Sequence, residues 1–280
     1  MANSNQGFDR IEVAQNALLI EYLGQAGYRI KSATTTFLID PYLSNYVVDG
    51  GFGPAEIFGR EFPPPEDPRR MENVDFVFIT HDHADHCDPQ TLHPLVQANP
   101  HLKIIAPITA ARTLQSAGIN PAQFLDPSEG QRRREGELTF AAIPSAHYEL
   151  DSDPATGTAA YLGYVIESSG VVLYHSGDTI LYPGLLKKLK NAAAHFDLVC
   201  LPVNGRDARR EAMGMVGNLD SREALELALQ LEARVLLPMH NDLFAANRVN
   251  PGILADISSN VAPRQRIHWL QPGELYLYIQ

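Results

Sequence analysis

Three histidines and two aspartates fall within the six residues His81-Asp82-His83-Ala84-Asp85-His86. The apolar run before them, residues 74–79, is rich in residues that favour β-strands. On an extended segment His81 and His83 point the same way, and a turn brings Asp85 and His86 to a neighbouring point. Imidazoles and carboxylates are the ligands that zinc and manganese take in proteins. The spacing predicts a metal site and suits two adjacent ions better than one; the alternative is a solvated polar loop.

Histidines and aspartates also follow several other apolar stretches along the chain. They lie just past the ends of predicted strands, at Asp40, His81, His147, Asp178 and His240. Strands whose carboxyl ends meet at one edge of a sheet collect residues that are distant in sequence. We therefore expect these positions to join the His/Asp motif in one site.

Short apolar strands and amphipathic helices alternate along the chain and must position that site. Strands are expected over residues 17–22, 28–30, 34–39, 74–79, 104–106, 138–143, 161–166, 171–174, 198–203, 234–237, 267–269 and 275–279, and helices over 91–98, 108–117, 183–194 and 221–231. The pattern predicts a single α/β domain over residues 1–280, built of two halves of about 1–155 and 156–280. The two halves would face each other as layers with helices outside.

Composition argues against several classes of protein. The chain has 280 residues, of which 45% are hydrophobic and 20% charged, as in ordinary soluble domains. A formal net charge of -11 disfavours a nucleic-acid or anionic-membrane partner. We expect no membrane span, no signal peptide and no disulfide framework from Cys87 and Cys200. These features predict a cytoplasmic protein and leave open whether it forms a homo-oligomer.

The composition of residues 43–70 predicts a long loop. They include the glycine-rich stretch Gly50-Gly51-Phe52-Gly53-Pro54 and the run Phe62-Pro63-Pro64-Pro65. Loops of this length are either functional lids and binding loops or disordered insertions. The sequence does not decide between these two.

The motif at residues 81–86 resembles the His-x-His-x-Asp-His signature of the metallo-β-lactamase superfamily. The resemblance implies an αββα sandwich, in which two mixed β-sheets pack face to face with helices outside. It also implies two divalent cations, zinc or manganese, between which the ligand types do not choose. The implied ligands are His81, His83 and His147 for the first metal, Asp85, His86 and His240 for the second, and Asp178 as the bridge between them.

Further segments resemble the branch of that superfamily that contains ascorbate-6-phosphate lactonases and is similar to phospholipases that cleave N-acylphosphatidylethanolamine. These segments are Leu23-Gly24-Gln25-Ala26-Gly27-Tyr28, Asp40-Pro41, Tyr174-His175-Ser176-Gly177-Asp178 and Leu237-Pro238-Met239-His240-Asn241-Asp242. The resemblance implies a metal-dependent hydrolase acting on a lactone, such as a phosphorylated sugar-acid lactone. A phosphodiesterase or phospholipase-type hydrolase is the alternative.

The expected mechanism uses a metal-bridging hydroxide as the nucleophile. Asp85 would bind one metal, orient the hydroxide and take its proton. Ligand imidazoles usually donate their second nitrogen to a carboxylate or carbonyl. Asp40, with Thr80 behind it, is the candidate for that supporting role.

Three residues past strand ends near the metals are candidate substrate contacts, Asn204, Arg206 and Asn241. An arginine there would hold a phosphate or carboxylate of an anionic small-molecule substrate. The alternative for this group is a salt-bridged surface loop. A non-catalytic metal-dependent sensor on the same scaffold is the competing class of function, because fold alone does not settle function.

Overall fold

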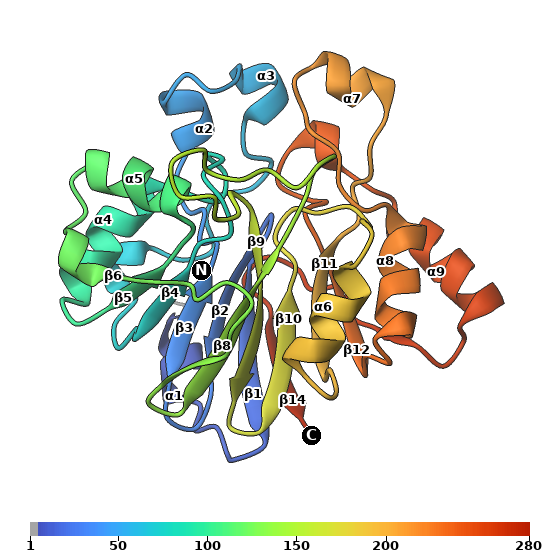
Figure 1. Ribbon diagram of the computed structural model, residues 1–280, viewed down its shortest axis with the longest axis horizontal. Helices are drawn as coiled ribbons and strands as arrows, with labels where there is room; N and C mark the ends of the chain where they lie inside the picture. Colours follow the sequence, from blue (N-terminus) through green and yellow to red (C-terminus); the bar gives the residue numbers. More distant parts are fainter. Residues whose placement is uncertain (1–4) are drawn as a thin grey trace.

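Two seven-stranded mixed β-sheets packed face to face form the centre of the protein (Figure 1). We describe residues 5–280 of the chain in a computed structural model. The first sheet has the strand order β14 (Leu275–Ile279), β1 (Ala17–Gly24), β2 (Gly27–Lys31), β3 (Thr36–Ile39), β4 (Phe76–Phe78), β5 (Lys103–Ile105) and β6 (Phe124–Leu125). The second has the order β13 (Arg266–Ile267), β12 (Val235–Met239), β11 (Leu198–Pro202), β10 (Val171–His175), β9 (Leu162–Ser168), β8 (Leu138–Pro144) and β7 (Arg133–Glu135).

The inner faces of the two sheets share one hydrophobic core. Alternate side chains of each strand point inward, as the twofold repeat of a strand requires. Phe37 and Phe78 of the first sheet meet Phe140 and Tyr164 of the second. The rings of Phe78 and Phe140 pack edge to face with their centroids 5.3 Å apart. The core therefore holds the two sheets together beneath the site described below.

Helices cover the outer faces of both sheets. On the first sheet lie α4 (Pro89–Ala98) and α5 (Ile108–Ser116), and on the second lie α6 (Leu185–Ala192), α8 (Ser221–Gln230) and α9 (Pro251–Val261). Each presents an apolar face to its sheet, which buries it away from water. This arrangement confirms the αββα sandwich predicted from the sequence. No helix within residues 5–280 has the length and apolar character needed to cross a bilayer.

Strand direction determines where the ends of the strands meet. In the first sheet β3, β4 and β5 are parallel. In the second, β10, β11 and β12 are parallel, and β8 shares their direction because both β8 and β10 are antiparallel to β9. Segments that follow these strands therefore leave the sandwich at its edge, where ligand sites of such sheets form.

Several short helices lie in stretches that the sequence predicted as irregular. Residues 43–70 contain α2 (Tyr46–Asp49), α3 (Ala55–Phe58) and the 3-10 turn η1 (Pro68–Arg70), and α7 (Ala208–Ala212) lies in the segment after β11. Figure 1 shows α2, α3 and α7 together at one end of the sandwich. The remaining short elements are α1 (Asn5–Arg10), η2 (Pro121–Gln123) and η3 (Ala245–Asn247).

Candidate metal centre

The His/Asp motif folds as a tight turn between β4 and α4. The backbone N–H groups of His86 and Cys87 both donate to the carbonyl of His83, at 3.0 and 2.8 Å. Asp88 then caps α4, where its side chain accepts from the N–H groups of Gln90 and Thr91. The turn therefore brings the motif's imidazoles together before the helix leads the chain away.

The structure gathers residues from both sheets around this turn. Three groups of ligand-type side chains each have ligand atoms within 4.8 Å of one another: His81, His83 and His147; His81, His86 and Asp178; and Asp85, His86 and His240. The first and third groups share no member. All seven residues that the sequence proposed as ligands belong to at least one group.

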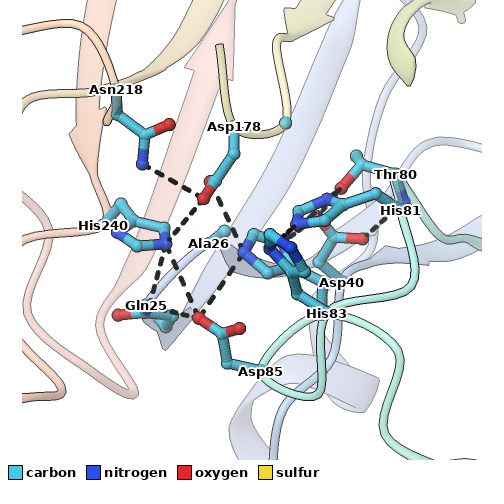
Figure 2. Close-up of polar contacts among 12 residues, drawn as sticks. Gln25, Ala26, Asp40, Thr80, His81, His83, Asp85, Asp178, Asn218 and His240 are labelled. Carbon is cyan, nitrogen blue, oxygen red and sulfur yellow. Dashed lines mark hydrogen bonds and ion pairs between the residues drawn. The ribbon is translucent and has the colours of Figure 1, made fainter. Parts of the chain in front are cut away.

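Asp178 lies between the first and third groups. One carboxylate oxygen, Oδ1, is 3.4 Å from Nε2 of His86. The other oxygen, Oδ2, is 3.1 Å from Nε2 of His240 and 3.9 Å from Nε2 of His147. Figure 2 shows Asp178, His240 and Asp85 turned toward one another. This position allows one carboxylate to serve two neighbouring ions.

Second hydrogen bonds hold the imidazoles from the first sheet. His86 donates from Nδ1 to Oδ2 of Asp40 at 2.7 Å. Thr80 donates its hydroxyl to the same oxygen at 2.6 Å, and its Oγ1 lies 2.9 Å from Nδ1 of His81. Asp40 and Thr80 therefore lie behind two ligand-type histidines, where the sequence placed them. Such bonds fix the tautomer and direct Nε2 toward the cluster.

The imidazoles from the second sheet are held in a similar way. His147 donates from Nδ1 to the carbonyl of Gly217 at 2.8 Å. The amide of Asn247 lies 3.3 Å from Nδ1 of His240. In both residues Nε2 is the nitrogen that faces Asp178. Four histidines thus turn the same kind of nitrogen inward.

Unpaired buried atoms show that these residues fit metal ions. Nε2 of His86, Nε2 of His147 and Oδ1 of Asp178 are buried and have no hydrogen-bond partner within the described residues. Leaving such atoms unpaired is costly in a protein interior. Once a cation displaces the proton that an imidazole holds, each of these atoms has a lone pair for the metal, so the donor set fits zinc or manganese.

The charged groups of the cluster shift one another's pKa. Burial lowers the pKa of His86, but Asp178, Asp85 and Asp40 raise it to about 9. Burial likewise lowers the pKa of His240, while Asp178 raises it most and brings it to about 10. Burial raises the pKa of Asp178, but His240 and His86 lower it well below its usual range. The carboxylates therefore remain ionised and supply the negative charge that a cation needs.

Gln25 belongs to the site and was not among the residues proposed from the sequence. It lies in the turn between β1 and β2, and its Nε2 donates to Oδ2 of Asp85 at 2.7 Å. The same atom is 3.0 Å from Nε2 of His240 (Figure 2). The backbone N–H of His240 donates to the carbonyl of Gln25. In the sequence, only the resemblance of the segment Leu23–Tyr28 to the lactonase-containing branch indicated Gln25.

The expected substrate contacts divide into two kinds. Asn204 is buried and lines a cavity beside the cluster. Neither Arg206 nor Asn241 lines it. Arg206 instead pairs with both carboxylate oxygens of Glu223, at 2.8 and 2.6 Å, which is the salt-bridged arrangement that the sequence left as the alternative.

Arg206 supports the site indirectly through Asn218. Its Nη1 donates to the backbone carbonyl of Asn218 at 2.9 Å. The side-chain amide of Asn218 donates to Oδ2 of Asp178 at 3.1 Å. Nothing in the sequence indicated Asn218, because it lies in an irregular stretch with no strand or motif to mark it.

Comparison with known proteins identifies the family. A family model described as the beta-lactamase superfamily domain matches residues 35–241. A UPF0173 metal-dependent hydrolase from Caldivirga maquilingensis is 25% identical over 270 residues, covering 91% of this chain and 96% of the relative. It carries no lactonase description, so the narrower branch stays a prediction.

Solved structures agree on the fold. A metallo hydrolase from Ignicoccus hospitalis matches with a TM-score of 0.66 and 20% identity, covering 94% of this chain and 98% of that one. A structure from Veillonella parvula, described as that of a possible metal-dependent hydrolase, matches with a TM-score of 0.68 and 17% identity, covering 94% of this chain and 99% of that one. Since the family model spans most of the chain and the fold agrees with it, the protein belongs to the beta-lactamase superfamily.

Proposed function

We propose that the protein is a metal-dependent hydrolase that holds two divalent cations, zinc or manganese. His81, His83 and His147 would hold one cation, Asp85, His86 and His240 the other, and Asp178 both. The observation that carries this proposal is the pair of ligand groups with no shared member and the carboxylate between them. The curated relative named above is also described as a metal-dependent hydrolase.

Such a cation pair lowers the pKa of a water molecule toward neutrality and polarises the bond that this water attacks. Residues of the protein orient this water and accept its proton. Asp85 lines the cavity, so its carboxylate can orient the attacking water and accept its proton. Gln25 holds Oδ2 of Asp85 and so directs the remaining oxygen. Asn218 holds Asp178 in the same manner.

For the substrate we propose a lactone or a related carboxylic ester. The resemblance of several segments to a branch with lactonases supports this choice. The cavity beside the cluster measures about 380 Å³, within the range of small-molecule sites. Within residues 5–280, no lysine or arginine lines the cavity to hold the charge of a phosphodiester. A cytoplasmic location and the oligomeric state remain predictions from the sequence.

The test is turnover of a small panel by protein loaded with zinc or with manganese. A lactone, a thioester and a bis-aryl phosphodiester separate the candidate reactions, and we expect the lactone to be hydrolysed fastest. If fully loaded protein hydrolyses none of the three, a metal-dependent sensor is the better account.

Asp85→Asn tests the proton-accepting role. With metal in sufficient excess to fill both sites despite the weaker amide ligand, we expect kcat for the lactone to fall at least 100-fold, because general-base catalysis contributes about 100- to 10,000-fold. Asp256→Asn is the matched control, since Asp256 is an exposed α9 residue that belongs to no ligand group and does not line the cavity. Unchanged turnover by Asp85→Asn with metal retained would refute the role.

A further inference from the structure

The cavity beside the metal ligands has apolar walls. Asp85, Asp178 and His240 lie at one side of it. The remaining walls come mainly from the α2–α3 segment, the segment after α7 and the segment after β12. They contribute Val47, Phe52, Phe58, Met215, Val216 and Phe244. Three segments that are distant in sequence thus line one cavity together with the metal-ligand residues.

Part of this apolar wall is firmly packed. The rings of Phe58 and Phe244 meet edge to face with centroids 5.6 Å apart. Phe244 also packs against Tyr42 at 6.2 Å. Val47 and Phe244 are buried in the same hydrophobic cluster. The wall is therefore preformed, which lowers the entropic cost of binding a ligand.

Other members of the wall are left facing water. Phe52 is 61% exposed and Val216 is 41% exposed, although both line the cavity. Exposed large apolar side chains beside a concave site are typical of ligand-binding surfaces. An apolar group of a ligand would cover them and gain the free energy of removing that surface from water.

The same cavity offers no cation to an anionic substituent. Within residues 5–280, neither lysine nor arginine lines it. The nearest candidate from the sequence, Arg206, is paired with Glu223. Asp82 adds a further carboxylate to the lining. A phosphate or carboxylate lying away from the metal ions would therefore lose its hydration without a compensating charge.

Asn204 offers the ligand a neutral polar group. Asn204 lines the cavity and is 5% exposed, and its Oδ1 has no hydrogen-bond partner within the described residues. Its Nδ2 has only a 3.4 Å contact with Asn247. A neutral amide of this kind recognises a hydroxyl, carbonyl or N–H group and does not require a charged one.

We propose that the substrate is a small lactone or ester whose substituent is uncharged and apolar and binds against the wall that includes Phe52, Phe58, Met215 and Val216. This inference rests on the proposed hydrolase function. Hydrolysis adds water across the acyl C–O bond and gives a carboxylic acid and an alcohol, joined in one molecule for a lactone. The phosphorylated sugar-acid lactone implied by resemblance does not match this cavity.

The first experiment compares substituents on one reacting group. The metal-loaded enzyme is given δ-lactones with alkyl chains of increasing length and a matched lactone whose chain ends in a carboxylate. We expect kcat/KM to rise about threefold per added methylene until the cavity is filled. The carboxylate-terminated compound is expected to be at least tenfold poorer than its uncharged counterpart. Equal or faster turnover of the anionic compound would overturn the proposal.

The second experiment changes the wall. Phe52→Ser combined with Val216→Ser is expected to raise KM for the longest alkyl lactone about tenfold and to leave that of the unsubstituted lactone unchanged. The matched control is Ile253→Ser with Val261→Ser, two α9 residues that are 50% and 60% exposed and do not line the cavity. An equal effect of both double variants, or no effect of the first, would contradict the assignment.

A binding measurement separates this inference from the proposed function. An uncharged fluorescent naphthylamine is titrated into the metal-loaded protein, and its displacement by alkyl lactones is followed. We expect binding that Phe52→Ser with Val216→Ser weakens about tenfold and the α9 control does not. Binding of this kind without turnover of any lactone would refute the hydrolase and retain the apolar site. Turnover with no apolar binding preference would refute the apolar site alone.

Discussion

At the scale of single residues, the site depends on side chains that orient other side chains. Gln25, Asp40 and His240 all have left-handed backbones, with φ values of 59°, 43° and 62°. Non-glycine residues in this conformation cost free energy and persist where the surrounding structure holds them, often at functional sites. Gln25 donates to Asp85 and accepts from the backbone N–H of His240, whereas Asp40 is held by its bonds to Thr80 and His86.

Asp40→Asn tests the support behind His86. The carboxylate of Asp40 accepts from Nδ1 of His86 and from both the backbone N–H and the hydroxyl of Thr80. Loss of its charge makes His86 a poorer ligand, so we expect metal affinity to fall about 10- to 100-fold. Competition with a chelating dye measures the change. Asp256→Asn on the exposed face of α9 serves as the control, and equal affinities for all three proteins would contradict the supporting role.

At the scale of elements, the strand ends explain why the site assembles. Asp40 follows β3, His147 follows β8 and Asp178 follows β10, and these strands deliver their carboxyl ends to the site. The order of residue types along the chain indicated which strand ends meet, whereas the resemblance to the metallo-β-lactamase superfamily implied which of these residues are ligands, and that ligand set stays a prediction. The inner strands were also predictable, because their apolar runs are continuous or alternate with period two.

Other parts were not predictable for identifiable physical reasons. The α2 and α3 helices are four residues each, too short to show a helical repeat. Helix α9 was missed, although Pro251 at its first turn and the Asn250 cap mark its start. Arg206 was expected to meet substrate, but its partner Glu223 comes from α8, and side-chain pairing of that kind is set by tertiary packing.

A buried carboxyl in β1 gives a prediction at this scale. Glu21 lies opposite Arg29 of β2, and both side chains are fully buried. Burial, and then the neighbouring Glu66, raise the pKa of Glu21 to about 8. The folded protein therefore binds this proton more tightly than the unfolded chain. Stability should fall as pH rises from about 4.5 to about 8.

Glu21→Gln should remove that part of the pH dependence. We expect the variant to gain about 1–3 kcal/mol in free energy of unfolding at pH 9 and to change little at pH 4.5. Denaturant unfolding at the two pH values measures it, with Glu226→Gln on the exposed face of α8 as the control. A loss of stability at pH 9 would show that the charged form is compensated.

At the scale of the whole molecule, the proposed cations would join the two sheets. The motif at residues 81–86 follows a strand of the first sheet, whereas His147, Asp178 and His240 follow strands of the second. Ions held between them would act as cross-links at one end of the sandwich. The hydrophobic core provides the other link between the sheets.

Metal removal should therefore lower thermal stability. A ligand present at 1,000 times its dissociation constant stabilises the folded state by about 4 kcal/mol. We expect chelation to lower Tm by several degrees and readdition of zinc or manganese to restore it. His147→Ala and His240→Ala should each show a smaller response, because each removes a ligand of one proposed ion. An identical Tm with and without chelator would argue against metal ions that join the sheets.

The number of metal ions per chain tests the central claim most directly. Protein stripped with a chelator, reloaded with excess zinc or manganese and freed of unbound ions is analysed by inductively coupled plasma mass spectrometry. Our account predicts two ions per chain. A value that stays at one or below for every divalent metal tried would contradict the dinuclear centre and the hydrolase mechanism built on it.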